Sequence, residues 1–372
     1  MLQVFASPSR YAQGPGATES LGSEMRGLGL EGPVLIVAGA STRRRLEDAW
    51  ARSCAAAGYR FEVFTFGGQC CRREIDAGLA SARAGGARTI VGAGGGKAID
   101  TARSVAAALG LDFASCPTIA STDAPTSAVS IIYNEEGTVV EIRNHPRNPA
   151  LVLVDTAVIL AAPARFLVAG MGDALSTWFE ARACSRSGAA NCRGGTMTRS
   201  GLALAELCWN TLRADGTSAL AAHAAGTQSP AFERIVEANT LLSGLGFESV
   251  GLAAAHAVHN GLSVAPGCHG ALHGEKVAFG TLTQLVLEQA PDEEVEAVLD
   301  FCGSVGLPVT LEEVGLADVD DPLLGRMARR AVQADESTHN EPFPVTAEMV
   351  AHAIRAADER GRRHRERTCA MA

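Results

Sequence analysis

The stretch VGAGGGKAID, residues 91–100, decides the fold of the first half of the chain. It completes the apolar run RTIVGA (88–93) and leads into a segment, 97–109, whose apolar residues recur at spacings of three and four. Glycines between a strand and a helix let the backbone approach a ligand, and the N–H groups that begin the helix favour phosphate. The stretch therefore predicts a strand, a phosphate-binding turn and a helix.

This turn differs from two familiar phosphate-binding motifs. A Walker A loop requires a glycine where Val91 stands and a serine or threonine where Ala98 stands. The common dinucleotide fingerprint requires a glycine at the place of Lys97. The sequence thus predicts a diphosphate site of another kind, and it leaves open a tight turn that binds no ligand.

Lysine is nearly absent from the chain. Of the 32 basic residues, only Lys97 and Lys276 are lysines. An ammonium is a compact point charge and a guanidinium is a planar fork, so a site that needs the first does not accept the second. Both lysines lie in glycine-flanked segments, and both are therefore candidates for function.

Runs like the one before the turn recur through the first 160 or so residues. We expect buried strands at 33–38, 60–65, 88–93 and 150–155, and helices at 41–57, 73–85 and 97–109. This alternation predicts a parallel sheet with right-handed crossovers. The segment AVSIIYNEEGTVVEI interrupts it and predicts a hairpin of strands 128–133 and 138–142.

Long helical patterns take over from Pro163 onward. The 372 residues are too many for one ordinary core, so the chain divides into two expected domains. We expect the first, residues 1–162, to be an α/β domain with a parallel sheet. We expect the second, residues 163–372, to be all-helical.

Composition excludes several classes of protein. The net charge of -9 and the short, local basic clusters argue against a nucleic-acid partner. No stretch approaches the roughly 18 apolar residues that cross a membrane, and the N-terminus lacks the pattern of a signal peptide, so we expect a cytoplasmic protein. The ten scattered cysteines are then expected to be reduced.

The segment GLAAAHAVHNGLSVAPGCHGALHGEK (251–276) carries four of the nine histidines. Clustered imidazoles, completed by a carboxylate, are typical ligands of Zn²⁺ and related divalent ions. Asp173 in LVAGMGDALSTWFEA is the candidate carboxylate, although an aspartate at a helix start is also a common cap. Any one of the histidines alone is as well explained by an ordinary hydrogen-bonded residue.

Several long segments together resemble the glycerol dehydrogenases of the iron-containing alcohol dehydrogenase superfamily. They are GAGGGKAIDTAR (92–103), PTIASTDAPTSAVSIIY (117–133), AGMGDALSTWFEA (169–181), GLGFESVGLAAAHAVHNG (244–261), LHGEKVAFGTLTQLVLE (272–288) and HNEPFPVT (339–346). The resemblance implies that residues 1–162 form a nicotinamide-dinucleotide-binding α/β domain and that residues 163–372 form an all-helical domain that binds metal and substrate. It places the metal in the cleft between them. It also implies NAD or NADP as cofactor, a small polyol as substrate, and a homo-oligomer that is usually an octamer.

Carried over by position, the resemblance assigns Asp173, His256 and His273 as the metal ligands. Larger iron-type relatives have a fourth ligand, a histidine four residues after the aspartate, where this chain has Thr177. This departure favours Zn²⁺ over Fe²⁺. Three protein ligands leave an open coordination position, at which the metal polarises the substrate hydroxyl.

The same resemblance assigns further roles. Asp123 and Phe247 match positions that touch the substrate, while His259 and His269 are expected beside a metal ligand or on the substrate side. The residues expected to contact the cofactor are Gly94, Gly95, Gly96, Lys97, Asp100, Thr118, Ser121, Ser127, Val129 and Tyr133.

One departure concerns the choice of cofactor. The family usually has an acidic residue just after the first strand, where it meets the ribose hydroxyls and disfavours a 2′-phosphate, but this chain has Gly39. Ser41, Thr42 and Arg43 then become possible phosphate ligands. We hypothesise that NADP is accepted or preferred, and the alternative is that Gly39 only loosens discrimination.

Three functions stay open at this point. The first is a glycerol or vicinal-diol dehydrogenase. The second is an NADPH-using aldehyde or ketone reductase of a specialised pathway, for which the changed cofactor site and Val250 are hints. The third is a lyase of the dehydroquinate synthase type, which needs more basic residues for a phosphorylated substrate than two lysines suggest.

Overall fold

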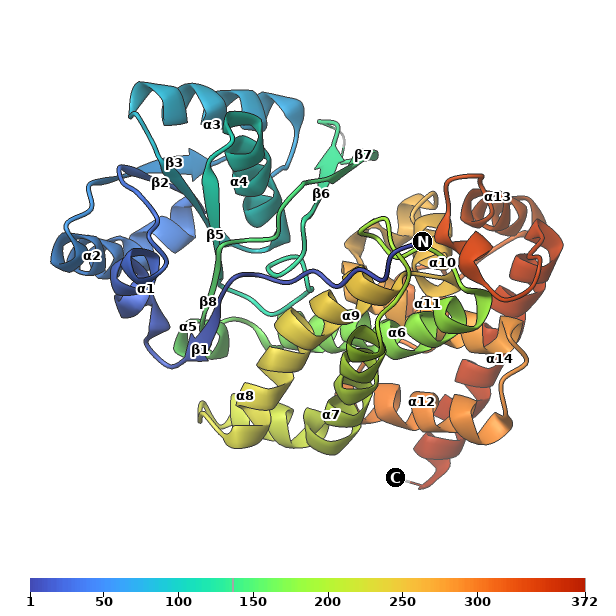
Figure 1. Cartoon of the computed structure of the whole chain (residues 1–372). Helices are drawn as coiled ribbons and strands as arrows, with labels where there is room; N and C mark the ends of the chain where they lie inside the picture. The colour runs from blue at the N-terminus through green and yellow to red at the C-terminus, as the bar shows by residue number, and fades with distance from the viewer. Residues whose placement is uncertain (136, 372) are drawn as a thin grey trace. The chain divides into compact units, whose positions relative to one another are not determined.

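The computed structural model describes residues 1–135 and 137–371, and these form two compact units (Figure 1). The sheet unit comprises Ser7–Phe166 and His223–Gly244, and the helical unit comprises Met1–Ala6, Leu167–Ala222 and Leu245–Ala372. The units differ from the expected domains, 1–162 and 163–372, chiefly in two short segments. Residues 1–6 pack with the helical unit through the bridge of Gln3 to Thr196, and 223–244 pack with the sheet unit, where Gln13 donates to Glu233.

The sheet unit is built on six parallel strands in the order β1-β8-β5-β4-β2-β3. The strands are β1 (Tyr11–Gly14), β2 (Val34–Gly39), β3 (Phe61–Phe66), β4 (Thr89–Gly94), β5 (Asp112–Pro117) and β8 (Leu151–Asp155). The predicted parallel sheet is confirmed, and each of the four predicted strands begins one residue later than expected. At β2 the reason is Pro33, which has no N–H for the sheet. The strands β1 and β5 were not predicted.

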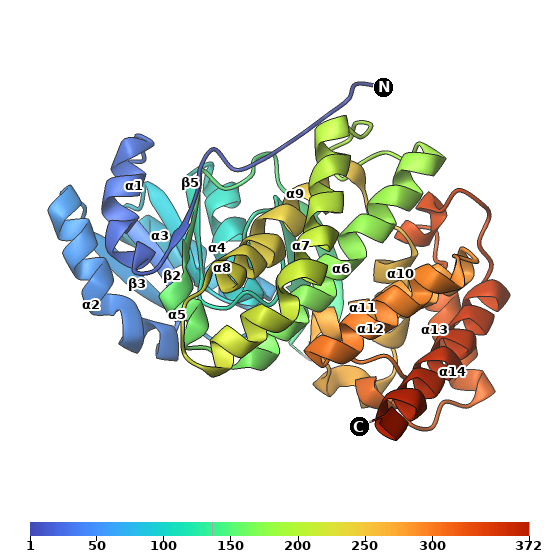
Figure 2. The same cartoon turned by 90° about the horizontal axis from the view of Figure 1, so that it is seen from below.

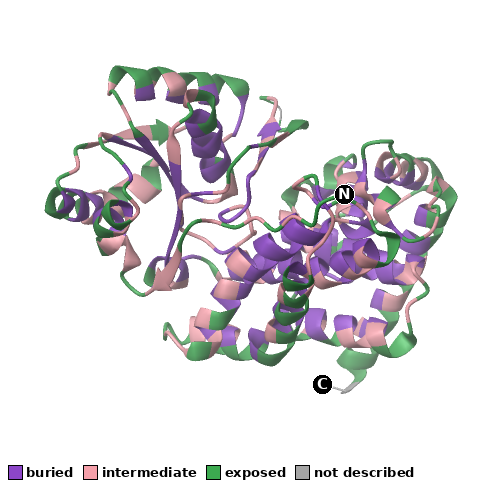
Figure 3. Ribbon diagram, viewed as in Figure 1, coloured by how far each residue is buried: buried purple, intermediate pink, exposed green. Residues whose placement is uncertain are grey.

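Helices cover both faces of this sheet. On one face α1 (Leu21–Gly27) and α2 (Ala40–Ala57) bury Met25 and Trp50, and on the other α3 (Arg72–Ala84) and α4 (Gly96–Leu109) bury Ile75 and Ile99. The strands β2, β4 and β8 are almost wholly buried between the two layers (Figure 3).

The strand order changes direction between β2 and β4, because β3 lies beyond β2 while β5 lies beyond β4. Ala38 of β2 pairs with Ala93 of β4, so Gly39 and Gly94 follow side by side at the carboxyl edge of the sheet. Ligands of open α/β sheets bind outside the carboxyl ends of the strands at such a switch point. The fold therefore places both glycine-containing turns at one edge.

The predicted hairpin is present as a separate antiparallel pair. It consists of β6 (Val129–Tyr133) and β7 (Val139–Asn144). Glu136 of the expected NEEG turn lies outside the described residues.

Helices make up the regular structure of the helical unit, apart from the bridge at Gln3, as far as the described residues extend (Figure 2). Its main helices are α6 (Ala164–Ser187), α7 (Arg199–Ala224), α9 (Ser243–Val250), α10 (Ala254–Leu262), α11 (His273–Leu287), α12 (Asp292–Val305), α13 (Asp321–Ala331) and α14 (Ala347–Met371). Within residues 1–135 and 137–371, no single helix has the length and apolarity to cross a membrane, although Pro230–Val250 and Ala254–Leu262 pass that test as a bent pair.

Candidate functional site

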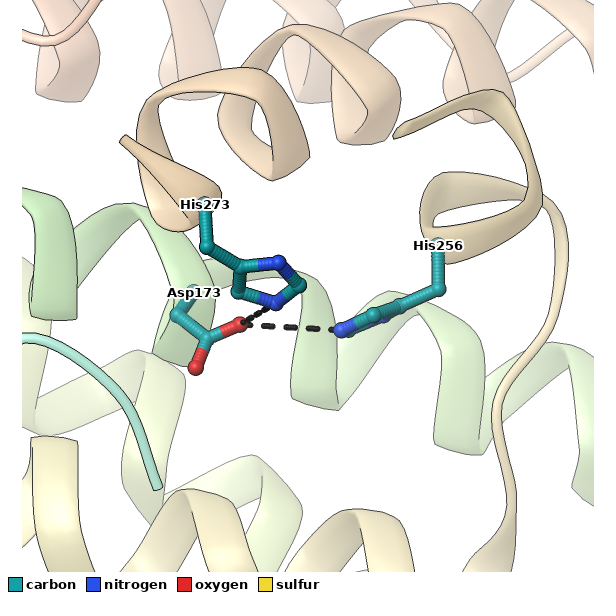
Figure 4. Close-up of side chains that lie close together, drawn as sticks. All are labelled: Asp173, His256 and His273. Atoms are coloured by element: carbon teal, nitrogen blue, oxygen red, sulfur yellow. Dashed lines mark ion pairs between the residues drawn. The ribbon is translucent and has the colours of Figure 1, made fainter. Parts of the chain in front are cut away.

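The helical unit brings together the three predicted metal ligands. Asp173 extends from α6, His256 from α10 and His273 from the first position of α11 (Figure 4). Asp173 Oδ1 lies 3.1 Å from His273 Nε2 and 3.6 Å from His256 Nε2. The sequence left open that Asp173 caps the start of a helix. It does not, because α6 already begins at Ala164.

Two glycines allow this convergence. A Cβ atom on Gly172 would lie 2.3 Å from the carbonyl oxygen of Gly274, and one on Gly274 would lie 1.7 Å from the carbonyl oxygen of Ala169. Neither position has room for a side chain, so α6 and the start of α11 touch through their backbones. This contact sets Asp173 beside His273.

His256 is held from behind by Glu180, a residue that the sequence analysis missed. Glu180 Oε2 lies 2.7 Å from His256 Nδ1, and the carboxylate is fully buried. An N–H at Nδ1 that donates to Glu180 leaves the lone pair of His256 on Nε2, which faces Asp173. The signal was the spacing of Asp173 and Glu180, since residues seven apart lie on one face of a helix.

The buried start of α10 is fixed by three side chains from elsewhere in the helical unit. Glu180, Gln284 and Glu341 accept hydrogen bonds of 2.9 to 3.1 Å from the backbone N–H groups of residues 253–256. The first N–H groups of a helix have no partner inside it, so a buried helix start requires acceptors of this kind. These contacts position the backbone that carries His256.

His273 is held by a directed chain of hydrogen bonds. The amide nitrogen of Asn260 donates to both carboxylate oxygens of Glu336, so Asn260 Oδ1 accepts from His259 Nδ1 at 3.1 Å. His259 Nε2 then accepts from His273 Nδ1 at 3.0 Å. This order assigns the lone pair of His273 to Nε2, on the side of Asp173.

Two imidazole lone pairs and a carboxylate oxygen thus converge on one point, an arrangement that repels itself unless a positive charge lies there. Burial opposes the charge on His256, yet Glu180 and Asp173 raise the pKa of its imidazole well above the usual value. Burial, His273 and Lys276 lower the pKa of His259. Ligand atoms about 3.4 Å apart are expected for bonds of about 2.1 Å in a tetrahedral zinc site, close to the two distances from Asp173. The donor set therefore fits a divalent cation.

Other residues near this cluster differ in what they can offer. Thr177, one helical turn after Asp173, is buried and has no ligand nitrogen. Lys276 follows His273 by one turn, and its Nζ donates to Ser263 Oγ at 3.0 Å. His269 is exposed in the 3-10 helix Pro266–Gly270. Phe247 is buried on α9, where its carbonyl accepts from the N–H of Gly251.

The glycine-rich turn of the sheet unit joins β4 to α4. No side chain caps α4 at Gly95, so the helix start keeps N–H groups for an anion. A Cβ on Gly96 would find only ordinary contacts of 3.6 Å. The protein therefore does not fill the space at Gly96, which suits a backbone that a ligand approaches.

Lys97 lies at the second position of α4, with Nζ 4.9 Å from the centre of the Tyr133 ring. Burial lowers the pKa of the Lys97 amino group and raises that of the Tyr133 hydroxyl to about 12. An ammonium at the start of a helix is well suited to a phosphate group.

Asp100, one turn further along α4, is directed into the protein. Its carboxylate accepts from Arg103 at 2.6 Å and from the N–H of Ile131 at 3.0 Å. Burial raises the pKa of Asp100 to about 6, although Arg103 opposes this. Asp100 joins α4 to β6, and its contact with a cofactor stays a prediction.

The remaining predicted cofactor residues lie on segments that follow strands of the sheet unit. Thr118 follows β5, and its N–H donates to the carbonyl of Gly94. The others are Gly39, Ser41 and Thr42 at the start of α2, Ser121 and Ser127 in the loop after β5, and Val129 on β6.

Asp123 is held by a helix irregularity that the sequence did not predict. Residues Ala238–Leu242 form a π-helix, and Asn239 within it donates to the carbonyl of Ala120. Ser243, directly after it, lies with Oγ 2.6 Å from Asp123 Oδ2. Single π-turns inside helices often occur at functional sites. The loop that carries Asp123 is thereby fixed within the sheet unit.

Comparisons with known proteins show which family the chain belongs to. Residues 8–156 match the family model described as "Iron-containing alcohol dehydrogenase". The chain is 47% identical to a glycerol dehydrogenase of Citrobacter freundii, covering 96% of this chain and 98% of that protein. It is also 47% identical to a glycolaldehyde reductase of Halobacterium salinarum, covering 99% and 100% of the two chains.

Among solved structures, the glycerol dehydrogenase of Schizosaccharomyces pombe superposes with a TM-score of 0.94 at 37% identity, over 99% of this chain and 93% of that one. Relatives this similar over nearly the whole length share the fold and the family. The chain belongs to the iron-containing alcohol dehydrogenase family.

Proposed function

We propose that the chain is a metal-dependent oxidoreductase that transfers a hydride between a nicotinamide dinucleotide and a CH–OH group of a small polyol, with glycerol as the preferred substrate. The observation that carries this proposal is the cluster of Asp173, His256 and His273, in which both histidines direct Nε2 toward one carboxylate oxygen. The high identity to glycerol dehydrogenases supports the choice of substrate.

Asp173, His256 and His273 would hold the cation, and Zn²⁺ suits this donor set. When bound, such a cation supplies Lewis-acid polarisation of a substrate hydroxyl. Glu180 keeps a proton on Nδ1 of His256, and Nε2 of His259 accepts a hydrogen bond from the protonated Nδ1 of His273. These two contacts keep both Nε2 atoms available as ligands.

The cofactor would lie at the carboxyl edge of the sheet. Gly94, Gly95 and Gly96 would bring the backbone and the N–H groups at the start of α4 to the diphosphate, and Lys97 would add a positive charge. A nicotinamide, when bound, would supply the acceptor or donor of the hydride. Asp123, whose carboxylate is held by Ser243, would accept the proton of a substrate hydroxyl.

A steady-state screen tests this proposal. Glycerol, 1,2-propanediol, dihydroxyacetone and short aldehydes are assayed with both cofactors, before and after exhaustive chelation and after Zn²⁺ is restored. We expect the highest kcat/KM for glycerol or another vicinal diol, loss of activity on chelation, and its return with Zn²⁺. Full activity after verified removal of the metal would refute the mechanism.

We further propose that the chain accepts NADP. The support is the end of β2, where no atom of the described residues lies within 4 Å of a Cβ built on Gly39 and the first turn of α2 has no acidic residue. Ser41 is exposed there, and Arg43 is part-exposed beside Glu47. A 2′-phosphate would meet hydroxyl and guanidinium donors and no carboxylate in that first turn.

The cofactor proposal is tested by kcat/KM for NAD and NADP in the wild type and in Gly39→Asp. We expect the substitution to move the ratio toward NAD by at least about tenfold, which is about 1.4 kcal/mol, because it restores a carboxylate at the ribose. Ala51→Asp, which adds a carboxylate at an exposed position of the same helix away from its first turn, is the matched control. A wild-type preference for NAD of tenfold or more would reject NADP as the preferred cofactor.

An aldehyde or ketone reductase is the second candidate function. The high identity to the glycolaldehyde reductase of Halobacterium salinarum favours it specifically. The same screen separates the two, because a reductase gives its highest kcat/KM with an aldehyde and NADPH. We also propose that the chain assembles into a homo-oligomer, an octamer, and light scattering tests this.

A further inference from the structure

A second group of carboxylates and a histidine lies elsewhere in the helical unit and shares no residue with the first. Glu296 and Asp300 are four residues apart on α12, so they lie on one face of that helix. His364 lies on α14, which packs beside α12 (Figure 2). His364 Nδ1 is 3.8 Å from Glu296 Oε2 and 3.8 Å from Asp300 Oδ1.

His364 is the unusual member of this group. The residue is only 2% exposed, and its Nδ1 is buried without a hydrogen bond to any described residue. The opposite edge of the ring lies against Gly303, where a Cβ would be 3.3 Å from Nε2. The imidazole is therefore packed in place with an unpartnered nitrogen directed at two carboxylates. A buried polar atom of this kind normally has a partner.

We propose that Glu296, Asp300 and His364 form a second divalent-cation site, which takes Zn²⁺ or a similar borderline ion. One imidazole and two carboxylates are a common ligand set for such ions. The ligand atoms all lie within 4.8 Å of one another, so small side-chain movements bring them to bonding distance. A bound ion would join the C-terminal helix α14 to α12.

The surroundings indicate an exchangeable ion. The side chains of Glu296 and Asp300 are 41% and 74% exposed, so water completes the coordination. Arg367 donates to Glu296 Oε2, the same oxygen that faces His364. A cation has to displace that guanidinium before it binds Glu296. The site should therefore bind more weakly than the cluster around Asp173, and removal of Arg367 should strengthen it.

The test is Zn²⁺ titration of the full-length protein, read by calorimetry and by metal content after desalting, in the wild type, His364→Gln, Asp300→Asn and Arg367→Gln. We expect a tight ion and a weaker ion per chain in the wild type, and only the tight ion in the first two variants. Arg367→Gln should lower the Kd of the weaker ion at least tenfold.

Asp300→Asn keeps the test independent of folding, because this side chain is mostly exposed. The matched control is Glu293→Gln, an exposed carboxylate on the same helix outside the group. Equal binding of the weaker ion by the wild type, His364→Gln and Asp300→Asn would overturn the proposal. An equal loss in the Glu293→Gln control, which indicates diffuse surface binding, would overturn it as well.

Discussion

The helical unit contains two clusters of carboxylates and histidines that differ less in their ligands than in what surrounds them. Around Asp173, which is 2% exposed, the outer nitrogen of each imidazole is held by another side chain, Glu180 or His259. Around His364 the carboxylates face solvent, and an arginine already occupies one of them. Support from the surrounding side chains sets ligand orientation and metal affinity. The first cluster is thus preorganised, as the proposed reaction centre requires, while the second has the open surroundings of the proposed exchangeable ion site.

The largest expected effect comes from the carboxylate of the first cluster. Asp173→Asn removes the charge that faces both Nε2 atoms, so we expect tight metal binding to be lost. We expect kcat/KM to fall on the order of a thousandfold or more, about 4 kcal/mol of transition-state stabilisation. Metal content and steady-state kinetics provide the measurement. Asp300→Asn is the matched control in the second cluster, and its kcat/KM should stay within about twofold of the wild type.

This comparison breaks down if Asp173→Asn keeps its metal and most of its activity. It also breaks down if Asp300→Asn loses activity as severely as Asp173→Asn does. Circular dichroism of both variants separates loss of the site from loss of the fold.

The next largest effect is expected at Glu180, which contacts the ligand His256 but is not itself a metal ligand. Glu180→Gln keeps the size of the side chain but brings an NH₂ group toward N–H donors that now meet carboxylate oxygens. We expect metal affinity to fall about 10- to 100-fold, as is usual when the outer partner of a ligand histidine is lost. For Arg367→Gln we expect the metal affinity of the second cluster to rise. Chelator competition measures both, and unchanged affinity in Glu180→Gln would contradict the assigned role.

The sequence predicted the parts that depend on local patterns. The β-branched runs gave four strands of the sheet to within a residue at their starts, because buried parallel strands are apolar throughout. The strands Tyr11–Gly14 and Asp112–Pro117 were not predicted, because YAQG and DFASCP are short and mixed in polarity. The sequence can indicate a strand by its composition, but pairing with neighbours makes short, mixed segments into strands.

The candidate site shows the same division. The histidines of 251–276 stood out by density, but resemblance selected which of them join Asp173. Glu180 was within reach of a periodicity argument once α6 was known to begin at Ala164. The acceptors Gln284 and Glu341 were not, because they reach the start of α10 only through tertiary packing. Residues that support ligands from distant elements have no local sequence pattern.

One of the side chains that fix the start of α10, Glu341, is a carboxylate whose ionised form is disfavoured by burial. Glu341 Oε1 accepts from the N–H of Ala254, while Oε2 has no hydrogen-bond partner among the described residues. Burial, with Glu288 and Glu180 nearby, raises the pKa of Glu341 to about 8, and Arg182 opposes this only in part. The second cluster, open to solvent, has no such buried acid among the described residues.

This raised pKa predicts how stability depends on pH. A carboxyl whose pKa is raised by folding contributes stability below its unfolded pKa and loses that contribution as pH rises through the folded pKa. The contribution of Glu341 should therefore fall by about 2 kcal/mol between pH 6 and pH 8. Glu341→Gln keeps the acceptor for Ala254 and cannot ionise, so its free energy of unfolding should change less over this range. Urea unfolding of both proteins at each pH, with Glu293→Gln as an exposed control, measures the difference. Parallel pH profiles for the wild type and Glu341→Gln would contradict this prediction. They would mean that the Glu341 carboxyl has an ordinary pKa and is already ionised in the folded protein at pH 6.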